Sequence, residues 1–223
     1  MRNRFDDELD FLNKQLTAMG QLCVTAIDQA TKALSNGNTD LAKKVITEDA
    51  SIDQAERDIE RLCLKLLLQQ QPVARDLRQI SAALKMITDM ERIGDQASDI
   101  AEIILTTPNA ESFNLPKVLD MSSEAANMVT NAIQAYVVKD LELSGRVEAN
   151  DDVVDRLFDE IRNELIQYII NNPGKDASRS IDIIMIAKYL ERIGDHATNI
   201  AEWVSFSITG VHEGGIDSKP PVT

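Results

Sequence analysis

An acidic segment of twelve residues occurs twice in this chain. Residues 91–102 read ERIGDQASDIAE and residues 191–202 read ERIGDHATNIAE, so the copies agree at nine of twelve positions and lie 100 residues apart. A repeat at this spacing predicts two copies of one structural unit. The segment is helical in period and spaces carboxylates one turn apart, and closely spaced carboxylates are typical ligands of metal cations.

The carboxylates of each copy fall on one face of the predicted helix. At about 100° per residue, the four acids of the first copy lie within about 80° of one another. A neighbouring stripe of small and apolar residues is predicted to pack inward. The first acidic stripe is Glu91, Asp95, Asp99 and Glu102, beside Ile87, Met90, Gly94, Ala97, Ala101 and Ile104. The second is Glu191, Asp195, Asn199 and Glu202, beside Ala187, Leu190, Gly194, Ala197, Ala201 and Val204.

The helix predicted before each copy carries a matching acidic stripe. In the first half this stripe is Asp49, Asp53, Glu56 and Glu60, beside Val45, Ile52, Ile59 and Leu66; in the second it is Glu148, Asp151, Asp155 and Asp159, beside Val154, Leu157 and Ile161. Carboxylates that converge need cations, raised pKa values or intervening solvent. Oxygen ligands suit iron, manganese, magnesium, calcium or zinc, so the stripes favour one metal site per half. A solvated acidic face is the alternative that spacing leaves open.

The repeated glycine and the substituted histidine bear on this interpretation. A glycine inside a helix costs about 1 kcal/mol relative to alanine, yet both copies keep one, at Gly94 and Gly194. Close approach of a neighbouring helix is the favoured explanation. His196 projects about 100° away from Asp195, which argues against a shared metal ion.

Helical periodicity dominates the rest of the chain. Six long helices are predicted to end near residues 34, 70, 105, 139, 170 and 209, with Thr39 as the cap of the second. The predicted fold is therefore all-α, with two tandem, sequence-related antiparallel three-helix bundles. They are assigned to residues 1–108 and 109–210, each with its own core, and residues 211–223 to a flexible tail.

Composition excludes several classes of protein. The net charge of −14 opposes binding to nucleic acid, and no basic cluster that would bind phosphate directly is visible in the sequence. Cys23 and Cys63 lack a metal-binding or redox motif and are predicted to be buried free thiols. The absence of a secretory signal and of a long apolar run predicts a cytoplasmic protein. No catalytic motif is present, so no enzyme activity is predicted.

The chain resembles the PhoU family, the accessory and regulatory proteins of the phosphate-specific transport system. The resemblance rests on the two ERIGD segments, on the acid-xxx-Asp pairs of the preceding helices and on QQQPVARDLRQI at residues 69–80, and it extends over 5–210. It implies two three-helix repeats that bind multinuclear metal clusters, of iron or zinc, with manganese or magnesium as alternatives. Carried over here, one cluster would use Asp49, Asp53, Glu91 and Asp95, and the other Asp151, Asp155, Glu191 and Asp195.

The resemblance also implies partners and a role. Such a protein would repress the phosphate-starvation response, limit phosphate uptake and link the transporter PstSCAB, through its ATPase PstB, to the sensor kinase PhoR. It would form a homodimer and reach the membrane only through these partners. Position 150 is Asn150, so Asp151 serves in the second acidic pair, and Asn199 replaces the acid found at Asp99, so the second site has one carboxylate fewer. A metal-carboxylate store or enzyme and a metal-free helical scaffold remain as alternatives.

Overall fold

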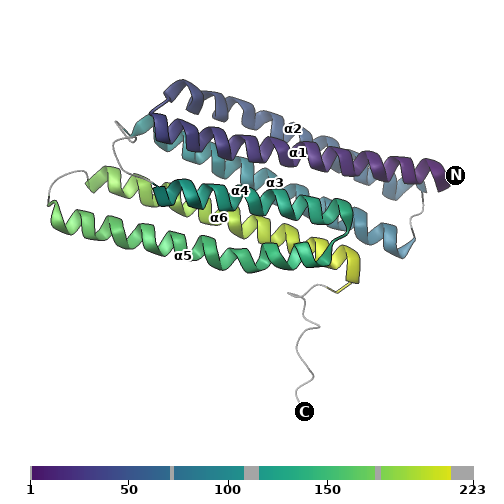
Figure 1. Cartoon of the computed structure of the whole chain (residues 1–223). Helices are drawn as coiled ribbons and strands as arrows, with labels where there is room; N and C mark the ends of the chain where they lie inside the picture. Colours follow the sequence, from purple (N-terminus) through teal and green to yellow (C-terminus); the bar gives the residue numbers. More distant parts are fainter. Residues whose placement is uncertain (1, 71–72, 108–115, 174–176, 212–223) are drawn as a thin grey trace, which may run out of the picture.

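Six long helices make up the structure (Figure 1). The computed structural model describes residues 2–70, 73–107, 116–173 and 177–211. The helices are α1 (Arg2–Asn36), α2 (Thr39–Gln70), α3 (Ala74–Thr106), α4 (Pro116–Val138), α5 (Leu141–Asn171) and α6 (Ala177–Thr209). Their ends confirm the predicted ones closely. The part of the predicted tail beyond Val211 lies outside the described residues.

The helices form two antiparallel three-helix layers that lie side by side, α1–α3 in one and α4–α6 in the other (Figure 1). The all-α fold of two tandem bundles is thus confirmed. The repeats meet mainly through α3 against α6 and through α1 against α4, whereas α2 and α5 pack on helices of their own repeat. No helix within the described ranges is both long and apolar enough to cross a membrane.

The predicted inward stripes are buried, except that Leu157 of α5 is only partly buried. Every residue of the two apolar stripes on α3 and α6 is buried, and so are Val45, Ile52, Ile59 and Leu66 on α2. Buried side chains of both repeats belong to one continuous apolar cluster, so the separate cores predicted for the halves are joined. The reason is that the central helices bury a second face against the other repeat, which a single apolar stripe in the sequence does not reveal.

The turn between the first two helices is repeated in the second half. Gly37 and Lys139 both adopt a left-handed conformation, with φ of 61° and 58°. The next residue caps the following helix in both repeats: Asn38 Oδ1 accepts from Leu41 N at 3.0 Å, and Asp140 does the same for the first turn of α5. The prediction that Thr39 caps α2 is therefore wrong. The cap is Asn38, whose side-chain oxygen accepts from the N–H group of Leu41, which has no partner within the helix.

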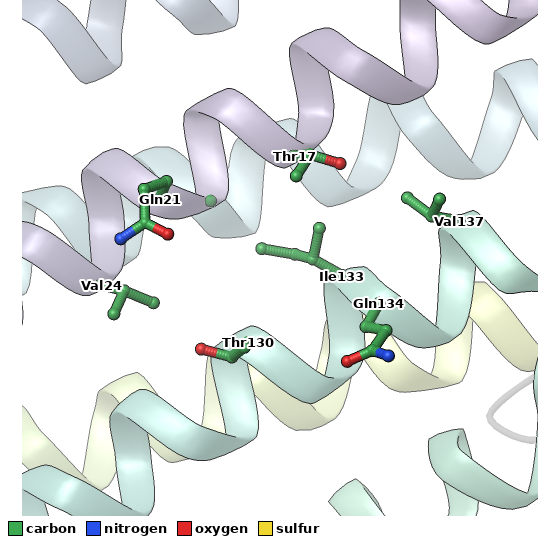
Figure 2. A pocket seen from close by; sticks show the side chains of 8 residues that line it. Thr17, Gln21, Val24, Thr130, Ile133, Gln134 and Val137 are labelled. Atoms are coloured by element: carbon green, nitrogen blue, oxygen red, sulfur yellow. The ribbon is translucent and has the colours of Figure 1, made fainter.

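The helices α1 and α4 contact each other at two equivalent points, because they occupy the same position in the two repeats. Gly20 of α1 faces Ile133 of α4, where an added methyl group would clash with the Ile133 side chain. At the second point Ser122 takes the position of Gly20 and Thr31 that of Ile133, and their hydroxyl groups are 2.5 Å apart. Figure 2 shows Ile133 directed toward α1 in a pocket of about 250 Å³. Small side chains on one helix thus let the two repeats approach closely.

Candidate functional site

The first acidic cluster lies where α2 crosses α3. Gly94 of α3 faces Asp49 and Ile52 of α2, and an added methyl group would lie 2.8 Å from Ile52 Cδ1 and 2.9 Å from Asp49 Oδ1. The predicted close approach of helices at Gly94 is therefore confirmed. This contact brings the acidic stripe of α2 against the acidic stripe of α3.

The innermost carboxylate of this cluster is Asp49. Burial, followed by the negative charges of Asp95, Asp53 and Asp99, raises its pKa from 3.8 to about 6. Burial and Asp95 raise the pKa of Glu91 in the same way. Within the described residues, Asp49 Oδ1 is buried and has no hydrogen-bond partner. An acceptor in this state is stabilised by a proton or by a cation.

Arginines neutralise the outer part of the first cluster. Arg92 Nη1 lies 3.2 Å from Asp95 Oδ2, and its Nε lies 3.5 Å from Glu91 Oε2. Arg57 Nη1 lies 3.7 Å from Asp53 Oδ2 on α2. These arginines are more than half exposed, so each pair contributes little to stability, and a competing cation could displace them at small cost.

The second cluster repeats the first between α5 and α6 with looser packing. A methyl group added to Gly194 would lie 3.3 Å from its nearest neighbour on α5, a tight contact but a longer one than at Gly94. Burial, Asp155 and Asp195 raise the pKa of Asp151, and burial and Glu191 raise that of Asp155. Lys188 forms an ion pair with Glu191. An ammonium group thus already lies among the acids here.

All eight predicted site residues therefore fall into two clusters of interacting carboxylates, one per repeat. In the part of the chain that the structure describes, however, no three His, Cys, Asp or Glu side chains are grouped closely enough to hold a metal ion. The donor set is all-oxygen, and it includes the unpartnered Asp49 Oδ1. By its chemistry the first cluster fits a hard or borderline cation, provided that its side chains rotate inward.

Two of the three departures of the second copy from the first, His196 and Asn199, have a structural explanation. His196 Nδ1 lies 2.9 Å from Asp89 Oδ1, and Asn199 donates from Nδ2 to the same oxygen at 3.2 Å. Asp89 belongs to α3, so both substituted residues bind the other repeat. Asn199 therefore replaces a carboxylate where a second negative charge would face Asp89.

At the symmetry-related contact of the α3–α6 interface, the carboxylate and its neutral partner come from positions equivalent to Asn199 and Asp89, respectively. Tyr189, which corresponds to Asp89 in the repeat, interacts with Asp99, which corresponds to Asn199. Burial and nearby acids raise the pKa of Asp99. The two repeats thus face each other with approximate twofold symmetry, and each side pairs one carboxylate with a neutral partner.

One group of functional interest, a cluster of three basic residues, was not predicted from the sequence. Arg75 and Arg78 of α3 and Lys139 of the α4–α5 turn line one cavity of about 440 Å³. The expectation of no basic cluster holds along the sequence but is wrong in space. Two signals pointed to it: the arginines belong to the QQQPVARDLRQI stretch, and Lys139 stands where the first repeat has glycine.

Comparison with known proteins identifies the family. The PhoU domain matches residues 16–104 and again residues 118–204. The chain belongs to the PhoU family. A relative from Clostridium acetobutylicum, named phosphate-specific transport system accessory protein PhoU homolog, is 34% identical and covers 94% of this chain and 96% of its own. A relative of the same name from Pseudomonas aeruginosa is 36% identical, over 93% of this chain and 86% of its own.

Solved structures of PhoU proteins have the same architecture. The crystal structure of PhoU from Pseudomonas aeruginosa matches with a TM-score of 0.85 at 36% identity, covering 93% of this chain and all of that one (100%). The phosphate transport system regulatory protein PhoU from Streptococcus pneumoniae matches with a TM-score of 0.86 at 24% identity, covering 93% and 98%, and shows the shared fold.

Proposed function

We propose that this PhoU-family chain is a non-enzymatic regulator of phosphate uptake and of phosphate-starvation signalling. One observation carries the proposal: curated relatives named as accessory proteins of the phosphate-specific transport system match more than nine-tenths of the chain at 34–36% identity. Both PhoU domains are matched, so the whole two-repeat unit is shared. Loss of the protein is expected to switch on phosphate-starvation genes while phosphate is abundant.

The proposed partners are the transporter PstSCAB, through its ATPase PstB, and the sensor kinase PhoR. The chain would act as an adaptor between them, in the cytoplasm and as a homodimer. Its net charge of −14 suits partners with basic patches. Binding of this kind forms faster at low ionic strength and weakens as salt is added.

Metal binding by the acidic clusters is the proposed structural element of this role. Asp49, Asp53, Glu91 and Asp95 would hold cations in the first repeat, and Asp151, Asp155, Glu191 and Asp195 in the second. Iron or zinc, with manganese or magnesium as alternatives, would supply positive charge between the stripes. The support is the raised pKa of Asp49 and its unpartnered Oδ1. In this role the carboxylates would fasten the outer helix of each repeat to a central one.

Elemental analysis tests the metal proposal directly. Untagged protein purified without chelator is compared with Asp95→Ala/Asp195→Ala and with Asp120→Ala, an exposed acid on α4 outside both clusters. Metal in the wild type and in the Asp120 variant, with loss in the double variant, is expected. A metal-free wild type would favour the scaffold alternative.

A genetic complementation experiment tests the regulatory proposal independently of metal. The gene is deleted in its host, and a phosphate-starvation reporter is measured in phosphate-rich medium. High reporter expression that the wild-type chain represses again is expected. Unchanged expression after deletion would contradict the regulatory role, whatever the metal content. Pull-down of PstB and PhoR at low and high salt then tests the adaptor assignment.

A further inference from the structure

A basic cavity lies where the start of α3, the α4–α5 turn and the end of α6 meet. Its volume is about 440 Å³, within the range of small-ligand sites. It is lined by Arg75, Arg78, Gln79, Tyr136, Lys139, Ser207 and Ile208. Three of these seven residues are cationic and none is acidic, although the chain as a whole has 37 acidic and 23 basic residues. The cavity is therefore positive within an acidic protein.

The cations of the cavity have no partner of opposite charge. Within the described residues, no ion pair joins Arg75, Arg78 or Lys139 to a carboxylate. The Nε atom of Arg78 is buried without a hydrogen-bond partner in the same part of the chain. The Arg78 side chain runs along Gly210, near the end of α6, where the partial negative charge of the helix offsets part of its own. Cationic side chains that line a cavity without a carboxylate among them favour an anionic ligand.

The position of Arg75 also favours an anion. The helix α3 begins at Ala74, and its N-cap residue Val73 makes no side-chain hydrogen bond to the first turn. The positive end of the helix dipole thus lies beside the cavity, where a cationic side chain is unfavourable by itself. Asp76 in the same turn is not among the lining residues. An anion between the helix end and Arg75 would stabilise both.

Lys139 occupies a backbone conformation that disfavours it. Its φ of 58° equals, within a few degrees, that of Gly37 at the same point of the first repeat. In both turns the following residue donates its N–H to a carbonyl five residues back, at 2.9 Å for Asn38 and 3.0 Å for Asp140. Glycine suits this helix-ending turn, whereas a lysine there is strained. Strain retained at a cavity wall indicates a role for the side chain.

We propose that this cavity binds a small phosphate-bearing anion. Two guanidinium groups, an ammonium group and a helix N-terminus form a donor set that matches the oxygens of a phosphoryl group. Tyr136 and Gln79, joined by a hydrogen bond of 2.9 Å, hold the wall between Arg78 and Lys139. A bound anion would connect the first repeat to the second. This inference goes beyond the proposed function and does not depend on metal.

Calorimetry on the full chain tests the site. Inorganic phosphate and pyrophosphate are titrated at low ionic strength with a chelator present, so that anions cannot bind through metal, and acetate is the carboxylate comparison. One site per chain is expected, with binding at least about tenfold weaker in Arg75→Gln and in Lys139→Gly, because each removes one charged hydrogen bond. Absence of binding by the wild type, or equally tight binding of acetate, would overturn the proposal.

Lys139→Gly also controls for the fold. Because glycine relieves the left-handed strain, this variant is expected to melt about 2–4 °C higher than the wild type while binding phosphate more weakly. Lys43→Gln, an exposed lysine on α2, is the charge-matched control and is expected to bind normally. Undiminished phosphate binding by Lys139→Gly and Arg75→Gln would place the anion elsewhere and would contradict this site.

Discussion

Replacing Asp49 by asparagine should stabilise the metal-free protein at neutral pH. The substitution keeps the size of the side chain and removes its charge. In the folded protein the pKa of Asp49 is about 6, above its ordinary value of 3.8, because the group is partly buried among other acids. Folding therefore costs free energy whenever this carboxyl group is ionised, and asparagine does not carry that cost.

The magnitude follows from the same pKa values. Between 3.8 and about 6 the full difference would correspond to about 3 kcal/mol. The group is partly exposed and screened by solvent, so we expect about 1 kcal/mol. The stabilisation that the proton provides is complete only below the unfolded pKa, and it is lost as the pH rises through about 6. Asp49→Asn should therefore exceed the wild type in stability above pH 6, and the difference should shrink toward pH 4.

Urea denaturation with a chelator present, followed by circular dichroism at pH 7.5 and pH 4.5, measures this difference. Asp120→Asn, at an exposed acid of α4, is the control and should change stability by less than about 0.5 kcal/mol at either pH. If Asp49→Asn destabilises the protein at pH 7.5, or if its effect does not depend on pH, the reasoning on carboxylate repulsion is refuted.

Further predictions concern the glycines and the thiols. Gly94→Ala should lower the free energy of unfolding by about 1–2 kcal/mol, because its methyl group would lie 2.8 Å from α2, whereas Gly194→Ala, with 3.3 Å to α5, should be nearly neutral in urea denaturation. Gly145→Ala, with nothing within 4 Å of the added methyl, should raise stability by about 1 kcal/mol, and a destabilised variant would contradict this. Burial raises the pKa of Cys23 and Cys63 to about 12, so both should react with a thiol reagent only after unfolding; rapid labelling of the native protein would be inconsistent with this burial.

Local patterns in the sequence determined the helices and their inward faces. A helix needs only residues three and four positions apart, so the apolar stripe containing Gly94 and the acidic stripe containing Asp95 could be identified from a single segment. The repeat then implied the same unit twice. Pairing of acids from neighbouring helices was also predictable, because in each half the stripes border the same core.

Contacts between the repeats could not be predicted in this way. His196 and Asn199 differ from the first copy for a reason that lies in Asp89, about 110 residues earlier in the chain. Asn199 looked like a lost ligand, whereas in the structure it donates a hydrogen bond across the interface. Sequence periodicity carries no information on which helices of two bundles meet, because that depends on side-chain packing on a second face of each helix.

The sequence by itself thus determined an acidic, all-helical repeat protein and the members of its two carboxylate clusters. The tertiary structure alone decided how close those carboxylates come and that Asp49 is the innermost one. It alone brought Arg75, Arg78 and Lys139 around one cavity, from segments about 60 residues apart. The physical reason is that charge density depends on distances in space, which helix packing sets, whereas the sequence records only the spacing along each helix.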